Sequence, residues 1–155
     1  MAYKIAILVG SLRKDSINRK VARSICAIRG DNLDCDMVEI GNLPLYSQDF
    51  DDPARTPQEY VRFRDQIRQA DGVLFCTPEY NRSIPGVLKN AIDVGSRPYG
   101  QSVFDKKPAA IVTASLCQCV GEHLLGHGAR GDPPVVGEDG RPDGGGLDHR
   151  ARISA

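Results

Sequence analysis

The segment KIAILVGSLRKDSINRKVARSICAI, residues 4–28, decides the fold at the start of the chain. It opens with a short apolar run rich in β-branched residues that ends at Gly10, which is typical of a buried parallel strand. Apolar side chains then recur from Ile17 to Ile28 at spacings of four, four and three residues, which is the apolar stripe of a helix. The segment therefore predicts a strand, a polar loop at residues 10–18 and a helix.

The rest of the first 116 residues continues this alternation. The sequence TPQE at residues 56–59 has the pattern of a capping box with proline at the first helical position, so it predicts the start of the second helix. Further strands are expected at residues 36–40, 72–76 and 109–114, and a third helix at residues 87–94. This order predicts an α/β domain with parallel strands, right-handed crossovers and ligand loops beyond the carboxyl ends of the strands.

Composition narrows the classes of function. The chain has 155 residues, with 20 basic and 20 acidic side chains, so its formal net charge is zero. This balance argues against nucleic-acid binding through bulk charge, and no apolar run approaches 18 residues. The first residues lack the layout of a secretory signal, and five irregularly spaced cysteines indicate reduced thiols. We expect a cytoplasmic protein with neither a nucleic-acid nor a membrane partner.

The first loop, GSLRKDSIN at residues 10–18, has the donors that a phosphate requires. Ser11 and Ser16 supply hydroxyls, Asn18 an amide and Arg13 a planar cation, beside the backbone N–H groups of a helix N-terminus. Neither G-x-G-x-x-G nor a Walker A motif is present. The alternative is that Ser16 or Asp15 only caps the helix, while Arg13 is a solvated surface charge.

The second loop, TPEYNRSIPG at residues 77–86, follows a buried strand. Two prolines stiffen it, and an aromatic ring lies beside backbone donors, so the loop could hold a flat heteroaromatic ligand. The alternative is a simple strand-to-helix connection in which Tyr80 packs on the domain.

Together the two loops carry a family resemblance. GSLRKDSINRK (residues 10–20) and TPEYNRSIPGVLKNAID (residues 77–93) resemble the NADPH-dependent FMN reductase family, which includes quinone and chromate reductases of flavodoxin-like fold. The resemblance runs from about residue 3 to residue 116. It implies that the FMN phosphate is held by Ser11, Arg13, Ser16 and Asn18, that the isoalloxazine ring lies against Pro78, Glu79, Tyr80 and Asn81, and that Ser115 is the last residue of the family's next cofactor loop.

The resemblance also implies a three-layer sandwich around a parallel sheet and an FMN-dependent NAD(P)H oxidoreductase. In such an enzyme NADPH or NADH gives hydride to flavin N5, and two electrons pass to a quinone, a flavin or a similar small acceptor. No catalytic side chain is needed, so the cysteines are expected to be bystanders. Relatives form homo-oligomers. The alternative is a catalytically impaired flavin-binding or interaction protein that lacks the third cofactor loop.

Residues 117–155 have a different composition. They contain nine of the 16 glycines and all three histidines, but no aromatic residue and no lysine. We therefore expect an incomplete flavodoxin-like domain at residues 1–116, its C-terminal strand and helix missing or replaced, and a poorly ordered tail produced by a shifted reading frame. An authentic short variant remains an alternative. A zinc site formed by Cys117, Cys119, His123 and His127 is a third alternative. It is less favoured because glycines interrupt its motif.

Overall fold

The computed structural model describes residues 2–115, and residues 117–155 with their cysteine–histidine motif lie outside this part. The described chain alternates strands and helices as the sequence predicted. The elements are β1 (Tyr3–Val9), α1 (Ile17–Ile28), β2 (Leu33–Val38), a 3-10 turn (Gln48–Asp51), α2 (Gln58–Arg68), β3 (Gly72–Thr77), α3 (Gly86–Ser96) and β4 (Ala109–Thr113).

The four strands form one parallel sheet in the order β2-β1-β3-β4. From β1 the chain first moves outward to β2, and then returns across β1 to add β3 and β4 on the other side. The strand order thus reverses between β1 and β3, which is the flavodoxin-like arrangement and creates a crevice at the carboxyl ends of these strands. Within the described residues β4 is an edge strand, since it pairs only with β3.

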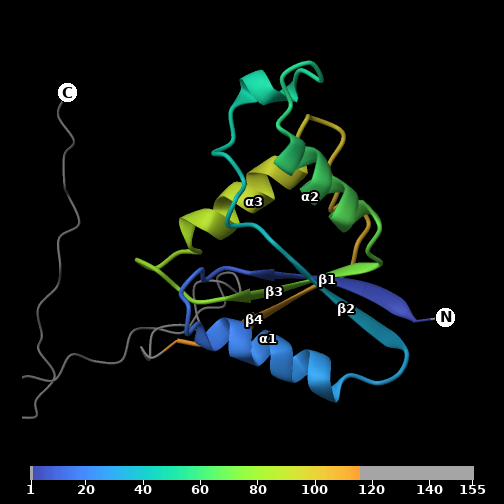
Figure 1. The fold of residues 1–155 in the computed structure, drawn as a ribbon, viewed down its shortest axis with the longest axis vertical. Coiled ribbons are helices and arrows are strands. Elements are labelled where there is room, and N and C mark those ends of the chain that lie inside the picture. Colours follow the sequence, from blue (N-terminus) through green and yellow to red (C-terminus); the bar gives the residue numbers. More distant parts are fainter. Residues whose placement is uncertain (1, 116–155) are drawn as a thin grey trace, which may run out of the picture.

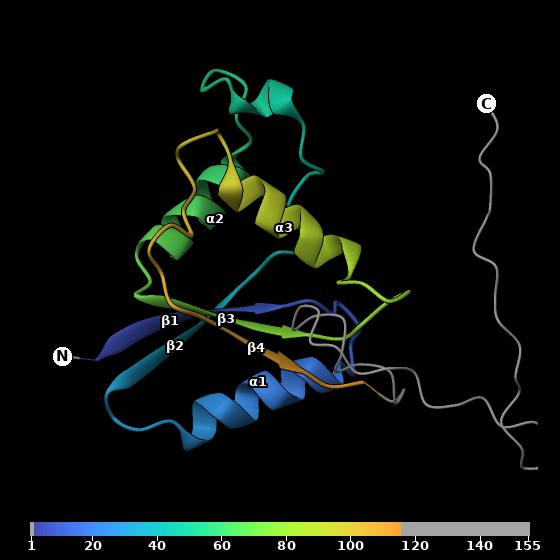
Figure 2. The same cartoon turned by 180° about the vertical axis from the view of Figure 1, so that it is seen from behind.

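Helices cover both faces of the sheet, as Figure 1 and the reverse view in Figure 2 show, with α1 on one face and α2 and α3 on the other. Successive residues of β1 point to opposite faces. Ala6 and Leu8 join the core under α2 and α3, whereas Ile7 and Val9 join the core under α1. The three-layer sandwich expected from the sequence is confirmed. No helix among residues 2–115 is both long and apolar enough to cross a membrane.

The second strand begins earlier than the sequence indicated. We expected residues 36–40, but β2 spans Leu33–Val38, and its first residue pairs with Tyr3 of β1. The side chains at the start of this strand are mixed polar and apolar, so hydrophobicity alone did not reveal it. Ile40 follows the strand but is buried in the core. The apolar pattern in the sequence therefore continued past the end of the strand at Val38.

The predicted capping box at α2 is wrong. Pro57 occupies the N-cap position and makes no side-chain capping bond. The Thr56 hydroxyl instead donates to the carbonyls of Phe50, at 2.8 Å, and Asp52, at 3.0 Å. The Thr56 hydroxyl therefore links the preceding 3-10 turn to the start of α2 and does not cap the helix.

The cysteines of the described part are free thiols. Burial raises the pKa of the Cys76 thiol to about 11. Burial, together with a hydrogen bond to Cys35, raises the pKa of the Cys26 thiol to about 11. Since the thiolate is the reactive form, these thiols are poor nucleophiles near neutral pH, which agrees with the expectation of bystanders.

Candidate functional site

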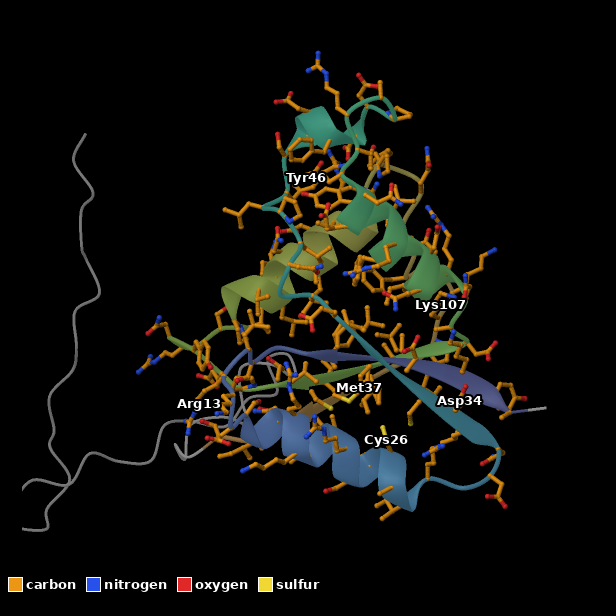
Figure 3. All side chains as sticks on the ribbon, viewed as in Figure 1. Arg13, Cys26, Asp34, Met37, Tyr46 and Lys107 are labelled. Atoms are coloured by element: carbon orange, nitrogen blue, oxygen red, sulfur yellow. The ribbon has the colours of Figure 1, made fainter. Side chains whose placement is uncertain are left out.

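A cavity of about 180 Å³ opens where the carboxyl ends of β1, β3 and β4 meet, and we call it the switch-point cavity. Figure 3 shows Arg13 at this end of the molecule and Asp34, at the start of β2, at the opposite end. Seven of the nine predicted site residues line the cavity. Its lining consists of Ser11, Arg13, Ser16, Ile17, Asn18, Pro78, Tyr80, Ala114 and Ser115.

Gly10 allows the first loop to approach the end of β3. Its N–H donates to the Cys76 carbonyl at 2.9 Å. A Cβ atom at this position would collide with Thr77 Oγ1, so any larger residue would push the two loops apart. Because Gly10 has no side chain, the first loop can lie close to the second, and residues of both loops line one cavity.

Ser16 is the N-cap of α1. Its Oγ accepts a hydrogen bond from the Arg19 N–H at 3.2 Å, and the residue is 3% exposed. Ser16 therefore caps the helix, and whether it also binds a ligand stays a prediction. A hydroxyl that accepts one bond can still donate another, so capping leaves the Ser16 proton available to a ligand at the positive end of the helix dipole.

Arg13 and Ser11 differ in exposure. Ser11 is 5% exposed, whereas Arg13 is exposed and forms no salt bridge with any other described residue. The guanidinium is thus a solvent-exposed cation that lines the cavity, and the Ser11 hydroxyl is a buried group in its wall. This pair suits an anionic group that enters from solvent.

Asn18 connects α1 to the end of β4. Its Nδ2 donates to the Ala114 carbonyl at 2.8 Å, and its Oδ1 accepts from the Ala114 N–H at 3.1 Å. The residue is 2% exposed. In the structure Asn18 therefore positions Ala114 and Ser115 as the third side of the cavity, and its role as a phosphate ligand stays a prediction.

The second loop contains a tight hairpin. Tyr80 and Ser83 exchange backbone hydrogen bonds of 2.9 and 3.1 Å, and both residues between them have positive φ, 52° at Asn81 and 59° at Arg82. This is the geometry of a type I′ turn, in which Asn is favoured. Pro78 is buried and Tyr80 is half-exposed. Asn81 lies exposed in the turn and does not line the cavity.

Glu79 also lies outside the lining of the switch-point cavity, although its neighbours Pro78 and Tyr80 belong to it. Its Oε2 is buried and has no hydrogen-bond partner within residues 2–115. A buried acceptor without a donor costs about 1–3 kcal/mol. An N–H group from a bound molecule would remove this cost.

Several residues that line the switch-point cavity were not predicted from the sequence. Ile17 and Ala114 contribute apolar surface to the switch-point cavity, and no motif distinguished them from core residues. A second cavity, which is lined by Arg19 and Arg23 from α1, was also not predicted. Their spacing of four residues on one helix was a signal that could have revealed a shared face.

Known proteins of one family match most of this chain. The model of the NADPH-dependent FMN reductase family matches residues 3–127. A quinone reductase from Pseudomonas putida is 58% identical over 113 residues, which cover 73% of this chain and 60% of the relative. A 2-hydroxy-1,4-benzoquinone reductase from Burkholderia sp. is 53% identical over 116 residues, covering 75% of this chain and 62% of the relative.

Solved structures share the fold. FerB, a flavoenzyme NAD(P)H:(acceptor) oxidoreductase from Paracoccus denitrificans, superposes with a TM-score of 0.69 and 44% identity, over 74% of this chain and 62% of that protein. The chain spans about three-fifths of the length of the curated relatives it matches. Because the family model extends from the first strand to beyond the last described one, the chain belongs to the NADPH-dependent FMN reductase family.

Proposed function

We propose that this chain is an FMN-dependent NAD(P)H oxidoreductase that reduces quinones, flavins or similar small acceptors. One observation carries the proposal, namely that hydroxyls, a cation and a helix N-terminus converge on one cavity at the β1/β3 switch point. The names of the relatives support a quinone as the acceptor, and NADPH or NADH as the electron donor.

The residues present fit the phosphate end of FMN. Ser11 and Ser16 can donate hydrogen bonds and Arg13 supplies positive charge, which is a donor set for a phosphate. The cavity holds about 180 Å³, less than the ~300–1,000 Å³ typical of a site for a whole small-molecule ligand. We therefore assign the cavity to the phosphate and adjacent atoms, with the ring extending toward Tyr80.

When bound, FMN would supply the redox chemistry between NAD(P)H and the acceptor. The side chains would bind and orient it. Pro78 and Tyr80 offer apolar surface to a flat ring, and Glu79 Oε2, which is buried without a partner in the described chain, could accept a hydrogen bond from a ring N–H. Asn18 would act by holding the end of β4 at the cavity.

Arg13→Ala tests the phosphate assignment. Loss of a charge-assisted contact costs about 1.5–3 kcal/mol, so FMN affinity should fall roughly 10- to 100-fold. Flavin fluorescence titration of the full chain measures it. Lys14→Ala is the matched control, because Lys14 is an exposed neighbour that does not line the cavity. Equal affinity of Arg13→Ala and the parent chain would overturn the assignment.

Tyr80→Ala tests the ring assignment. We expect it to reduce FMN affinity more than affinity for a phosphate-only competitor, because the side chain contacts the ring and not the phosphate. Competition titrations with inorganic phosphate measure both quantities. If both affinities fall alike, the second loop acts only through the stability of the domain.

A second candidate function is a flavin-binding protein without turnover. The small volume of the switch-point cavity favours it. The two functions differ in one assay, the oxidation of NADPH by the FMN-loaded chain with a quinone present. Yellow protein that does not oxidise NADPH would establish the binding function.

We also propose that residues 1–116 form the cofactor-binding domain and that residues 117–155 are a tail from a shifted reading frame. The change in composition supports the boundary, although the family model continues to residue 127. Reading the coding DNA in the other frames tests the origin of the tail. A family-like continuation downstream of codon 116 is expected, and its absence from both frames would refute the proposal.

The remaining proposals concern the cellular setting. We propose a cytoplasmic location, supported by free thiols in the described part. We propose a homo-oligomer, supported by the family resemblance, and no nucleic-acid partner, supported by zero formal net charge. Light scattering of the full chain tests the oligomeric state.

A further inference from the structure

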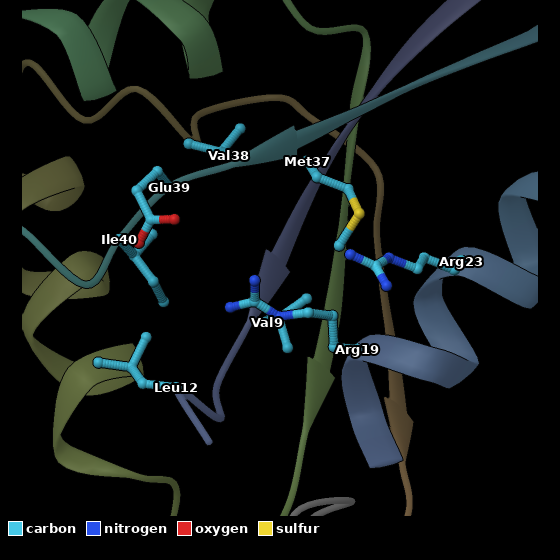
Figure 4. Close-up of a pocket in the computed structure, with 8 residues that line it drawn as sticks. All are labelled: Val9, Leu12, Arg19, Arg23, Met37, Val38, Glu39 and Ile40. Atoms are coloured by element: carbon cyan, nitrogen blue, oxygen red, sulfur yellow. The ribbon is translucent and has the colours of Figure 1, made fainter. Parts of the chain in front are cut away.

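A second cavity, of about 210 Å³, lies between α1 and the carboxyl end of β2, and we call it the α1–β2 cavity. Arg19 and Arg23 line it from α1, and Met37 and Glu39 line it from β2 and the residue that follows. Figure 4 shows both guanidinium groups on the side of α1 that faces β2, with Arg23 beside Met37. None of these residues lines the switch-point cavity.

The two arginines are electrostatically unpaired. Neither forms a salt bridge with a residue of the described chain, and Arg19 Nε is buried without a hydrogen-bond partner there. The Glu39 carboxylate also lines the cavity, but its Oε1 accepts from the Gly41 N–H at 2.8 Å. Two cations against one carboxylate leave net positive charge, and a buried charged donor without a partner is unfavourable.

We propose that the α1–β2 cavity binds a phosphate monoester, of the kind that NADPH carries on the ribose of its adenosine. Two guanidinium forks one helical turn apart suit the oxygens of a phosphate. The volume is below that of a site for a whole drug-sized ligand, so the cavity fits a phosphorylated fragment rather than a complete dinucleotide.

Two features favour a phosphorylated sugar over inorganic phosphate. The second oxygen of Glu39 can accept a hydrogen bond from a sugar hydroxyl, and Met37 offers apolar surface. The first loop also lines both cavities. Leu12 lines the α1–β2 cavity, whereas Ser11 and Arg13 line the switch-point cavity. A dinucleotide donor that reaches the flavin could therefore extend toward the arginines. This source of the phosphate rests on the proposed function.

The test is calorimetric titration of the full chain, saturated with FMN, with 2′-AMP, 5′-AMP and inorganic phosphate. We expect 2′-AMP to bind most tightly. Arg19→Gln and Arg23→Gln should each weaken it roughly 10- to 100-fold, as expected for a charge-assisted contact. Lys20→Gln, which removes an exposed cation from the same helix, should leave it unchanged. Because Arg23 is exposed, its variant keeps the test valid if Arg19→Gln does not fold.

The possible results distinguish a phosphorylated sugar from free phosphate. They also distinguish a failure of this proposal from a failure of the proposed function. Equal affinity for inorganic phosphate and 2′-AMP, lost in both arginine variants, would assign the site to a free phosphate. Unchanged 2′-AMP affinity in both Arg19→Gln and Arg23→Gln would overturn the site. The variants change Arg19 and Arg23, which do not line the switch-point cavity, so a failure of FMN to bind would refute only the proposed function.

Discussion

The two faces of the sheet have different compositions. Under α2 and α3 lies a broad core that includes Tyr60, Phe63 and Leu88, each at most 1% exposed. Under α1 the core is smaller, and α1 itself buries only Asn18 and Ala22. The polar side chains of α1 instead line both cavities. The difference indicates that the first face provides stability, whereas the second carries the ligand-facing groups.

Leu8 and Ile7 give the sharpest test of this difference, because they are adjacent in β1, are both fully buried and point to opposite faces. Replacement of such residues by alanine costs about 2–5 kcal/mol, depending on how well the site can collapse. We expect about 4–5 kcal/mol for Leu8→Ala under the broad core, and about 2–3 kcal/mol for Ile7→Ala. Urea unfolding measures both, and equal losses would contradict the comparison.

Alkaline pH should act mainly through the α1 face. Cys76 belongs to its core and Cys26 packs against it, and both thiols have a pKa raised to about 11 from 9.0. Between pH 9 and 11 the unfolded chain loses these protons first, so the free energy of unfolding falls as pH rises through this range. Cys76→Ala should flatten this dependence in thermal unfolding.

Tyr60 on the other face provides the control for the alkaline effect. Burial raises the pKa of its phenol, so it acts in the same direction, but from a higher ordinary value. Tyr60→Phe should therefore change the slope between pH 9 and 10 less than Cys76→Ala does. A slope that disappears in Tyr60→Phe would place the alkaline sensitivity under α2 and α3.

The smallest effect is expected at the outer part of the face under α2 and α3, where Ile111 pairs with Phe75. Ile111 of β4 is 46% exposed, in contrast to the buried residues of β1 and β3. Ile111→Thr should change the free energy of unfolding by no more than about 0.5 kcal/mol, the usual range for surface substitutions. A loss above about 1 kcal/mol in urea unfolding would mean that another surface covers this strand.

The sequence alone predicted much of the fold. Three of the four strands and all three helices were located near their observed positions, because apolar periodicity is a local property of the chain. The exception, β2, starts with residues whose place depends on pairing with β1. The N-cap at Ser16 was also predictable, since capping involves residues only three apart.

The site was only partly predictable. Local motifs located the loops at Ser11–Ser16 and Pro78–Tyr80, but the sequence could not show that Asn81 forms the turn rather than lining the cavity. Its positive φ depends on the hairpin bonds between Tyr80 and Ser83. Asn without glycine is a weak turn signal by itself.

What only the tertiary structure decided are the contacts between distant segments. Asn18 reaches Ala114 across 96 residues, and Arg19 and Arg23 face Glu39 because β2 lies beside β1. The sequence determined which residues had the chemistry for these roles. Where these residues meet depends on the strand order β2-β1-β3-β4, which places the carboxyl ends of all four strands at one edge of the sheet. No local pattern in the sequence encodes this order.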